Sequence, residues 1–386
     1  MTILYILDYG TVGGATKAFI SLINQIKKYD VTPIVVTGKR NDLYNLLESL
    51  KIQTIAAGHY TALESFSFKS LRWPYRLVKY IIRYYIHEYK ALSILESCLD
   101  FSQIDLIHTN SARNTLGCRL AKKYCIPHLV HIREFGDRDF NCIKLTPQYI
   151  KLLDNYSSCF LSVSKSVQDY WNTKGIDPDK NHLIYDGVNY EDITKSSDKD
   201  KTNVKLKMFM AGGVYPTKGQ HLAVEAIGYL PIDIRNNVTL DIAGWYSEIY
   251  ITSMKKYAED RGYSRQICFL GSINNVHEII GQYQVGLMCS KSEGFGLVTV
   301  EYMHGQLGVI ASNSGACPEL IEDGNTGLLF KSGDSKDLAR CIEMLYNDRS
   351  LLIKLSNNAK KDALNRFTAS INAEKIYKKY NELINK

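Results

Sequence analysis

The sequence predicts an α/β protein with two doubly wound, Rossmann-like domains. Short β-rich runs alternate with amphipathic stretches, the alternation stops once at a charged segment, and it then restarts. The chain has 386 residues, which is long for one hydrophobic core and sufficient for two ordinary domains. Ligands of doubly wound sheets bind beyond the carboxyl ends of the strands. We therefore expect the functional residues on the loops that lead from strands into helices.

The first domain is predicted over residues 1–193 from βα units that indicate a parallel sheet. Its strand candidates are Ile3–Leu7, Ile34–Thr37, Asp105–Thr109, Leu129–Ile132 and Phe160–Val163. Residues 194–205 are predicted to be a linker, because the run from Lys195 to Lys201 is charged and free of apolar residues.

The second domain is predicted over residues 206–365 from a renewed βα series. Its strand candidates are Met208–Ala211, Leu240–Ala243, Ile267–Leu270, Val285–Cys289 and Val309–Ala311. Residues 366–386 are expected to form a C-terminal helix that packs back on the first domain.

Composition narrows the class of protein and its partners. Hydrophobic residues make up 45% and charged residues 23%, which is typical of a globular chain. The 9 cysteines form no C-x-x-C pair and suit free thiols in a reducing cytosol. Residues 1–8 lack the basic region of a signal peptide, and no apolar run approaches the ~18 residues of a membrane span. A net charge of +7 favours an anionic partner without identifying it.

A glycine-containing loop follows the first strand of each domain. Residues 10–15 read Gly-Thr-Val-Gly-Gly-Ala, and residues 211–219 read Ala-Gly-Gly-Val-Tyr-Pro-Thr-Lys-Gly. Glycine lets the backbone approach a phosphate at a helix N-terminus, and Lys218 can meet a diphosphate as a point charge. The first loop does not fit the G-x-G-x-x-G dinucleotide fingerprint. A plain turn in the first loop and a surface lysine in the second are the alternatives.

A third loop carries two carboxylates. Residues 290–301 read Ser-Lys-Ser-Glu-Gly-Phe-Gly-Leu-Val-Thr-Val-Glu, with a Gly-Phe-Gly turn that opens a helix. Glu293 is expected in the loop and Glu301 inside the helix. Carboxylates suit sugar and ribose hydroxyls, whereas free N–H groups after Gly296 suit phosphate. Taken alone, the E-x7-E spacing is also compatible with two solvated glutamates.

Residues 283–330 resemble the signature region of the retaining GT-B glycosyltransferases of family 4. The shared features are Ser290, the E-x7-E spacing, Glu301-Tyr302-Met303 where the family has E-A-M, Gly308–Ser312, Gly315, Glu319 and Asp323–Leu329. Earlier segments agree in order and spacing: Gly13-Gly14, Asp105–His108, Val163–Val167, Tyr185–Val188, Lys218-Gly219 and Asp241–Gly244. The resemblance covers nearly the whole chain and is strongest in the second domain. It implies the GT-B fold, in which two Rossmann-like domains face a central cleft, and hexosyl- or related glycosyltransferase activity.

The resemblance also implies roles for individual residues. Glu301 would bind ribose, Glu293 the donor sugar, and Lys218 with the N–H groups of Leu297 and Val298 the diphosphate. Gly13 and Gly14 would close over the phosphates from the first domain. The expected donor-binding residues are Gly13, Gly14, Gly212, Lys218, Ser290, Glu293, Gly294, Phe295, Gly296, Leu297, Val298 and Glu301, and the catalytic candidates are Glu293, Lys218 and Arg133.

Two positions depart from the family pattern. Gly213 stands where the family usually has an Arg five residues before the phosphate-loop Lys. Arg133 stands where the family often has a His at the end of a strand. Our hypothesis is that Arg133 supplies the positive charge missing at position 213. The alternative is a surface ion pair of Arg133 with Glu134 or Asp137.

The mechanism expected from the resemblance uses a nucleoside-diphosphate sugar as co-substrate, retains the anomeric configuration, and requires no metal or other cofactor. The sequence shows no D-x-D directly after a strand and no diagnostic nucleophile-and-base spacing. Lys218, helix-terminal N–H groups and Arg133 would stabilise the leaving diphosphate in place of Mg²⁺. We favour front-face attack, because the sequence identifies no carboxylate for double displacement.

A basic, aromatic helix is predicted over residues 71–90. Arg72, Arg76, Lys79 and Arg83 recur on one face and are bordered by aromatic and aliphatic residues. This pattern fits a helix at an anionic bilayer surface, or one that meets a polyprenyl-diphosphate carrier. A core-packed helix with a solvated basic edge is the alternative.

These features favour a cytoplasmic enzyme, peripheral on the inner face of the cell membrane, that acts in bacterial surface polysaccharide synthesis. Its partners would be a nucleotide-sugar donor and a glycan or polyprenyl-linked acceptor. A catalytically silent GT-B binding protein is the main alternative: the missing Arg supports it, and the intact Glu293 and Glu301 oppose it. A nucleotide-sugar epimerase fits the Glu-Gly-Phe-Gly-Leu segment less well. No nucleic-acid module is present, so no nucleic-acid partner is expected.

Overall fold

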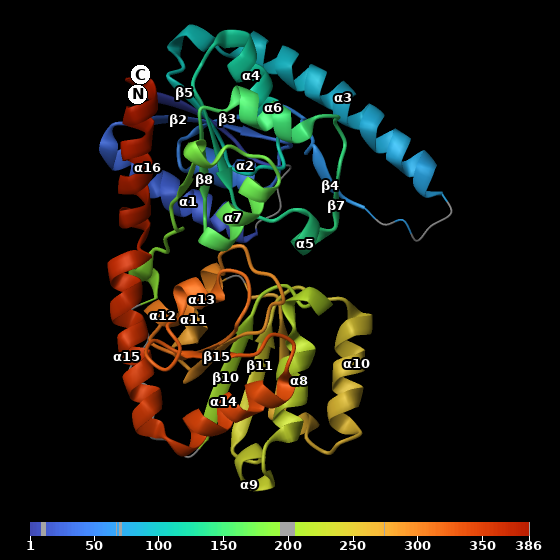
Figure 1. The fold of residues 1–386 in the computed structure, drawn as a ribbon, viewed down its shortest axis with the longest axis vertical. Helices are drawn as coiled ribbons and strands as arrows, with labels where there is room; N and C mark the ends of the chain where they lie inside the picture. The colour runs from blue at the N-terminus through green and yellow to red at the C-terminus, as the bar shows by residue number, and fades with distance from the viewer. Residues whose placement is uncertain (9–12, 67, 69–71, 194–204, 274, 386) are drawn as a thin grey trace. The chain divides into compact units, whose positions relative to one another are not determined.

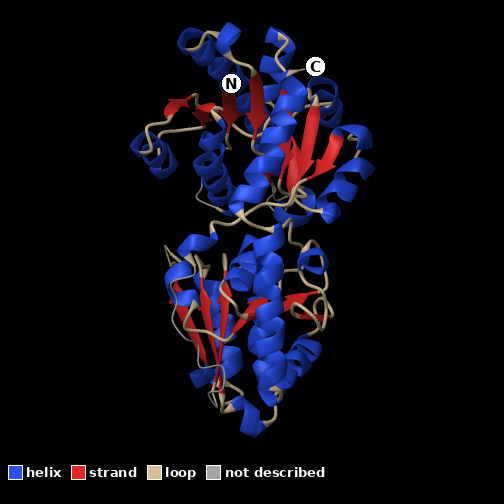
Figure 2. Cartoon of the chain, turned by 90° about the vertical axis from the view of Figure 1, so that its left-hand side faces the viewer, coloured by secondary structure: helices blue, strands red, loops and turns tan. Residues whose placement is uncertain are grey.

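The computed structural model describes residues 1–8, 13–66, 68, 72–193, 205–273 and 275–385. The chain divides into two compact units: unit 1 comprises residues 1–187 and 369–386, and unit 2 comprises residues 188–368. Each unit is a parallel sheet with helices packed on its faces (Figures 1 and 2). The α/β fold predicted from the alternation of strands and helices is therefore confirmed. Residues 194–204 of the predicted linker lie outside the described residues.

The sheet of unit 1 has seven parallel strands in the order β3-β2-β1-β5-β6-β8-β9. They are β1 (Thr2–Ile6), β2 (Thr32–Thr37), β3 (Gln53–Ala56), β5 (Leu106–Thr109), β6 (His128–Ile132), β8 (Cys159–Ser162) and β9 (Asn181–Leu183). A separate antiparallel pair is formed by β4 (Leu63–Ser65) and β7 (Cys142–Lys144). Strand order reverses between β1 and β5, the position where doubly wound sheets bind ligands.

The helices of unit 1 include one from the end of the chain. They are α1 (Gly14–Ile26), α2 (Asp42–Ser49), α3 (Trp73–Cys98), α4 (Leu116–Tyr124), α5 (Asp137–Phe140), α6 (Tyr149–Tyr156), α7 (Lys165–Thr173) and α16 (Ala369–Ile384). α16 runs beside α1 (Figure 1), and its Ile376 and Tyr380 share a buried cluster with Phe19 and Ile23. The hydroxyl of Tyr380 also donates to that of Tyr5 on β1. The last helix is therefore part of the core of unit 1.

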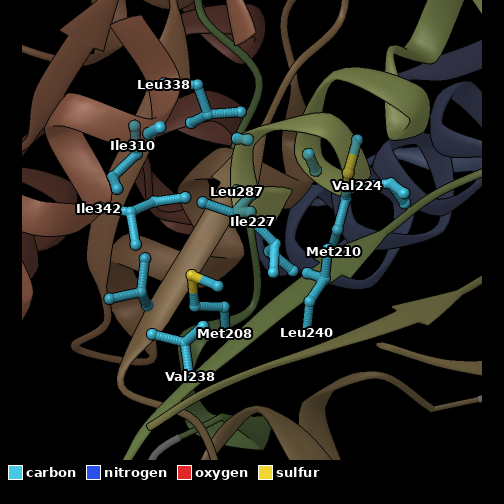
Figure 3. Close-up of a cluster of buried hydrophobic side chains, with 14 of the residues drawn as sticks. Met208, Met210, Val224, Ile227, Val238, Leu240, Leu287, Ile310, Leu338 and Ile342 are labelled. Carbon is cyan, nitrogen blue, oxygen red and sulfur yellow. The ribbon is translucent and has the colours of Figure 1, made fainter. Parts of the chain in front are cut away.

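The sheet of unit 2 has six parallel strands in the order β12-β11-β10-β13-β14-β15. They are β10 (Leu206–Ala211), β11 (Val238–Ala243), β12 (Ile267–Gly271), β13 (Val285–Met288), β14 (Gly308–Ser312) and β15 (Leu328–Phe330). Figure 3 shows part of the core, where Met208 and Leu240 of the sheet meet Ile227 and Ile342 of the helices. The sheet again reverses its order, between β10 and β13.

The helices of unit 2 are α8 (Gln220–Tyr229), α9 (Ile232–Arg235), α10 (Glu248–Glu259), α11 (His277–Ile280), α12 (Leu297–His304), α13 (Cys317–Leu320), α14 (Ser335–Asn347) and α15 (Arg349–Arg366). The orientation of α12 is fixed by Tyr302, which is fully buried and accepts a hydrogen bond from Ala211 N at 2.7 Å. Its ring lies over Gly286, where an added Cβ would come within 2.4 Å of the ring. The glycine on β13 thus makes room for the large side chain on α12.

The ten predicted strands correspond to β1, β2, β5, β6, β8 and β10–β14. The sequence did not predict β3, β9 and β15, each of which lies at the edge of its sheet, or the antiparallel pair of β4 and β7. These strands have three or four residues, too few for a periodic apolar pattern to stand out.

Candidate functional site

The carboxyl edge of the sheet in unit 2 brings Lys218 and Glu293 together. Lys218 ends the short 3₁₀ turn Pro216–Lys218 after β10, and Glu293 lies in the loop between β13 and α12. Lys218 Nζ donates to Glu293 Oε2 at 2.7 Å, and the two side chains are 26% and 15% exposed. The pair places a cation and an anion, both accessible to a ligand, at the point where strand order reverses.

Close backbone packing explains why these loops meet. Gly219 has a φ of 75°, and a Cβ there would come within 2.2 Å of the carbonyl oxygen of Cys289. Lys291 N donates to the carbonyl oxygen of Thr217 at 3.0 Å. Gly315 also approaches the backbone of Glu293, because a Cβ added at Gly315 would lie 2.6 Å from the backbone carbonyl oxygen of Glu293. Two glycines therefore hold the Glu293 loop against the Lys218 turn.

The start of α12 adds backbone donors to the pair. Gly296 caps the helix with a φ of 89°, a conformation that favours glycine. The helix begins at Leu297, and the N–H groups of Leu297 and Val298 precede those of Thr299 and Val300, which donate to the Gly296 carbonyl. Glu293 lies beside this cap, because a Cβ added at Gly296 would come within 3.2 Å of Glu293 Cγ. Ser290 and Phe295, which belong to the same loop between β13 and α12, are buried.

Glu301 faces a residue that the sequence analysis did not identify. Its side chain is 9% exposed, and its Oε1 lies 3.1 Å from His277 Nε2 on α11. His277 precedes Glu301 by 24 positions and belongs to no recognised motif. Each glutamate of the E-x7-E pair therefore has its own basic partner, Lys218 for Glu293 and His277 for Glu301. The structure thus shows both glutamates in defined hydrogen bonds.

The missing phosphate-loop Arg has a physical explanation. A Cβ added at Gly213 would come within 2.5 Å of the ring of Tyr215. The neighbouring Gly212 is exposed and has a φ of 139°. Gly244 packs against it, because a Cβ added at Gly244 would lie 1.8 Å from the carbonyl oxygen of Gly212. The loop therefore excludes a side chain at position 213 as long as Tyr215 keeps its place.

In unit 1, the expected glycines lie at the start of α1. Gly13 precedes the helix, and its carbonyl accepts hydrogen bonds from Thr16 N and Lys17 N. It is exposed with a φ of −107°, and a Cβ added there would meet no described atom within 4 Å. Gly14 is the first residue of the helix. Residues 10–12 of the predicted loop lie outside the described residues.

Arg133 is buried in an ion pair that the sequence analysis did not foresee. Its Nη1 binds Asp186, its Nε donates to Asn110 Oδ1 at 3.1 Å, and its Nη2 contacts His131 Nδ1 at 3.2 Å. The expected alternative, a surface pair with Glu134 or Asp137, is wrong, because Arg133 is 8% exposed and pairs with Asp186. Asp186 offsets the guanidinium charge within unit 1.

A second buried charged group lies beside this pair. Glu134 accepts a hydrogen bond from Ser111 Oγ at 2.7 Å. Burial, with the nearby negative charge of Asp8, raises the pKa of Glu134 to about 7. Burial also raises the pKa of Asp8, against the attraction of Arg113. The carboxyl edge of unit 1 therefore holds Glu134, whose pKa lies near neutral pH, together with Asp8, whose pKa is raised by burial.

The basic helix α3 begins at Trp73, with Arg72 directly before it. From Tyr84 onward the helix packs into unit 1 through Tyr84, Glu88, Ala91 and Leu95, whereas none of residues 73–83 is buried. A stripe of large apolar side chains faces outward: Tyr75, Val78, Ile82, Ile86 and Tyr89, which are 71%, 56%, 53%, 48% and 76% exposed. We call this set the α3 stripe.

The basic residues of α3 differ in their surroundings. Lys79 is exposed and lines a surface depression of about 390 Å³ together with Arg83 and members of the α3 stripe. The guanidinium of Arg83 also lies 4.3 Å from the centre of the Tyr60 ring, and that of Arg76 lies 5.5 Å from the Phe66 ring. Among the helices that the structure describes, none has the length and apolar character needed to cross a bilayer.

Two family models match the chain in succession. The model described as Glycosyltransferase Family 4 matches residues 12–192, and the model described as Glycosyl transferases group 1 matches residues 191–362. The two matched regions correspond to the two halves of the predicted GT-B architecture.

Curated relatives extend along most of the chain. A Campylobacter jejuni alpha-1,4-N-acetyl-D-galactosaminyltransferase, named for an undecaprenol-diphosphate-linked acceptor, is 26% identical over 366 residues, 93% of each chain. An Escherichia coli UDP-Gal:alpha-D-GlcNAc-diphosphoundecaprenol alpha-1,3-galactosyltransferase is 24% identical over 78% of this chain and 81% of its own length.

A solved structure of similar fold is Anabaena HepE in complex with UDP and glucose. It superimposes with a TM-score of 0.77 at 20% identity, over 99% of this chain and 100% of that one. The glycosyltransferase WaaG, which is involved in lipopolysaccharide biosynthesis, gives a TM-score of 0.68 at 13% identity. The two consecutive family matches show that the chain belongs to the group 1 glycosyltransferases, and the fold that it shares with these structures is the GT-B fold.

Proposed function

We propose that this glycosyltransferase transfers a sugar from a nucleoside-diphosphate sugar to a polyprenyl-linked glycan, with retention of anomeric configuration and without a metal ion. The hydrogen bond between Lys218 and Glu293 beside the N-terminus of α12 is the observation that carries this proposal. It joins one cation suited to a diphosphate with one carboxylate suited to sugar hydroxyls.

The proposed donor pocket divides its polar groups by charge. Lys218 and the first N–H groups of α12 would hold the diphosphate, since both favour negative charge. Glu293 and Glu301 would accept hydrogen bonds from the hydroxyls of the sugar and the ribose. Gly13 and Gly14 of unit 1 would approach the phosphates by their backbone.

Lys218 and the helix N-terminus would stabilise the charge that develops on the leaving diphosphate. The acceptor hydroxyl would attack from the face that the diphosphate leaves, and a phosphate oxygen would take its proton. Glu293 would orient the sugar throughout this step. Such a mechanism predicts turnover in the presence of a chelator such as EDTA.

The proposed acceptor is a polyprenyl-diphosphate glycan at an anionic membrane surface. The two named relatives act on undecaprenol-diphosphate-linked substrates, which motivates this class. The α3 stripe supports it, because an apolar face bordered by Lys79 and Lys90 suits a bilayer interface with acidic headgroups. With this acceptor, the protein would be a peripheral membrane protein on the inner face of a cell membrane, and it would act in bacterial surface polysaccharide synthesis.

A panel of UDP-, GDP- and ADP-sugars tests the donor part of the proposal by thermal stabilisation. We expect one nucleotide class to raise the melting temperature of the wild-type chain and to lose this effect in Lys218→Ala. No stabilisation by any member of the panel would contradict the proposal.

Flotation with liposomes tests the membrane part. We expect the chain to float with vesicles that contain acidic lipid and to sediment without them. The double variant Tyr75→Ser with Ile82→Ser should lose flotation. Ile232→Ser is the matched control, because Ile232 is 72% exposed but lies on α9 of unit 2. Equal flotation with neutral and acidic vesicles would contradict the membrane proposal.

A further inference from the structure

His277, the hydrogen-bond partner of Glu301, belongs to none of the sequence motifs of the donor site. Glu301 has a side chain that is 9% exposed, and a buried carboxylate requires a hydrogen-bond donor. Among the residues that the structure describes, His277 is the hydrogen-bond partner of this carboxylate, at 3.1 Å from Oε1. A carboxylate oxygen only accepts, so Nε2 of His277 carries the proton in this contact.

The packing of α11 shows that this contact is built into the fold. Ile280, one turn after His277, is fully buried and packs against the end of α12. Gly305 makes this approach possible, because a Cβ there would come within 2.4 Å of Ile280 Cγ2. α12 in turn is held by Tyr302 through its contact with Ala211 N. Both partners of the hydrogen bond therefore sit on anchored helices.

The contact leaves the two oxygens of Glu301 in different states. Oε1 accepts from His277, whereas no described residue donates a hydrogen bond to Oε2. A carboxylate with one oxygen fixed cannot rotate freely about its last bond, so the direction of the second oxygen is also fixed. Such an oxygen suits one defined hydroxyl pair better than a freely turning group would.

We infer that His277 is a positioning residue for the donor nucleotide: it fixes Glu301 so that Oε2 accepts from the ribose hydroxyls of a nucleoside diphosphate. This inference rests on the proposed function, which gives Glu301 its ribose role. It adds a residue and a selectivity: the pocket distinguishes ribonucleotides from 2′-deoxyribonucleotides, and the distinction depends on His277.

The test compares binding of UDP with 2′-deoxy-UDP by isothermal titration calorimetry, with the GDP and ADP pairs measured in parallel. For the nucleotide that binds, we expect the wild-type chain to prefer the ribose form by about tenfold, as for one hydrogen bond to a charged group. His277→Ala should reduce this preference to about twofold or less. His277→Gln should retain most of it, since its amide N–H can still donate to Oε1.

Glu278→Gln is the matched control, because Glu278 is the exposed neighbour of His277 on the same short helix. It should keep the full preference. In turnover assays, His277→Ala should raise the KM for the donor more than it lowers kcat, since the inference gives His277 a role toward the ribose and none toward the reacting sugar.

The outcomes separate this inference from the proposed function. Nucleotide binding in which His277→Ala discriminates as the wild type does would overturn the role of His277 and leave the donor proposal intact. Equal binding of the ribose and deoxyribose forms by the wild-type chain would overturn the ribose role of Glu301 as well, and leave the roles of Lys218 and Glu293 intact. Absence of binding by every nucleotide would contradict the proposed function itself. Circular dichroism of both His277 variants checks that each is folded, and His277→Gln keeps the test open if His277→Ala is not.

Discussion

Lys218 Nζ and Glu293 Oε2 lie 2.7 Å apart, although 75 positions separate them in the chain. If Lys218 binds diphosphate and Glu293 binds sugar, a bound donor must compete with this ion pair. We therefore expect Glu293→Gln to bind UDP or GDP at least as tightly as the wild type, while sugar transfer falls by about 10²-fold or more. Lys218→Ala should weaken nucleotide binding by about tenfold or more, measured by calorimetry. Weaker nucleotide binding in Glu293→Gln would contradict this division of roles.

Gly13 offers a test of function that is separate from stability. Because a Cβ at this position meets no described atom within 4 Å and φ is −107°, Gly13→Ala should change the free energy of unfolding by less than about 0.5 kcal/mol. If the Gly13 backbone approaches the donor phosphates, turnover should nevertheless fall. Gly117→Ala is the contrasting control, since its Cβ would lie 2.2 Å from Thr109 Oγ1 and should destabilise the chain. Unchanged turnover in Gly13→Ala would exclude the phosphate contact.

Gly286 and Tyr302 should behave as a coupled pair. Gly286→Ala places a methyl group 2.4 Å from the Tyr302 ring and should destabilise unit 2 by about 1–3 kcal/mol. In a Tyr302→Ala background, the same change should cost much less, because the ring is gone. Denaturant unfolding of the two single variants and the double variant measures the coupling. Additive effects would show that the ring is not the obstacle.

Glu134 should make stability depend on pH. Burial raises its pKa from 4.5 to about 7, so between these values the folded chain holds a proton that the unfolded chain has lost. The contribution of Glu134 to the free energy of unfolding is fully present below pH 4.5 and is lost as the pH rises through 7. The loss is on the order of 1–3 kcal/mol. Glu134→Gln should reduce the difference in unfolding free energy between pH 5 and pH 8. The exposed Glu278→Gln should leave it unchanged, and an equal pH response in both variants would contradict this assignment.

Arg133 and Asp186 separate a structural role from a catalytic one. Asp186→Asn removes the counterion of a buried guanidinium and should cost about 3–5 kcal/mol, whereas Arg133→Met combined with Asp186→Leu should be far less destabilising. If Arg133 also stabilises the leaving diphosphate, donor turnover should fall in the folded double variant. Unchanged turnover in the double variant would show that Arg133 has a structural role and no catalytic one.

The sequence was most informative where strands are long and apolar. The strands that line the two switch points, β1, β5, β10 and β13, were all predicted, because their apolar runs and following loops are distinct. Glu293 and Glu301 were recognised as a pair by their spacing. Their separate partners were not, because Lys218 and His277 reach them through folding across 75 and 24 positions.

The same limit explains the incorrect partner of Arg133. Glu134 and Asp137 were considered because they are near in the chain, but β6 turns the Arg133 side chain toward Asp186, 53 positions away. Likewise, Gly213 was recognised as a departure from the family, yet the ring of Tyr215 that excludes a side chain there appears only in the structure.

Donor turnover in the absence of acceptor tests the central claim most directly. We expect the wild-type chain to release nucleoside diphosphate slowly from one nucleotide sugar of the panel, in the presence of EDTA, and Glu293→Gln and Lys218→Ala to abolish this release. Tight nucleotide binding by the wild type without turnover of any donor would contradict the account and favour a catalytically silent GT-B protein.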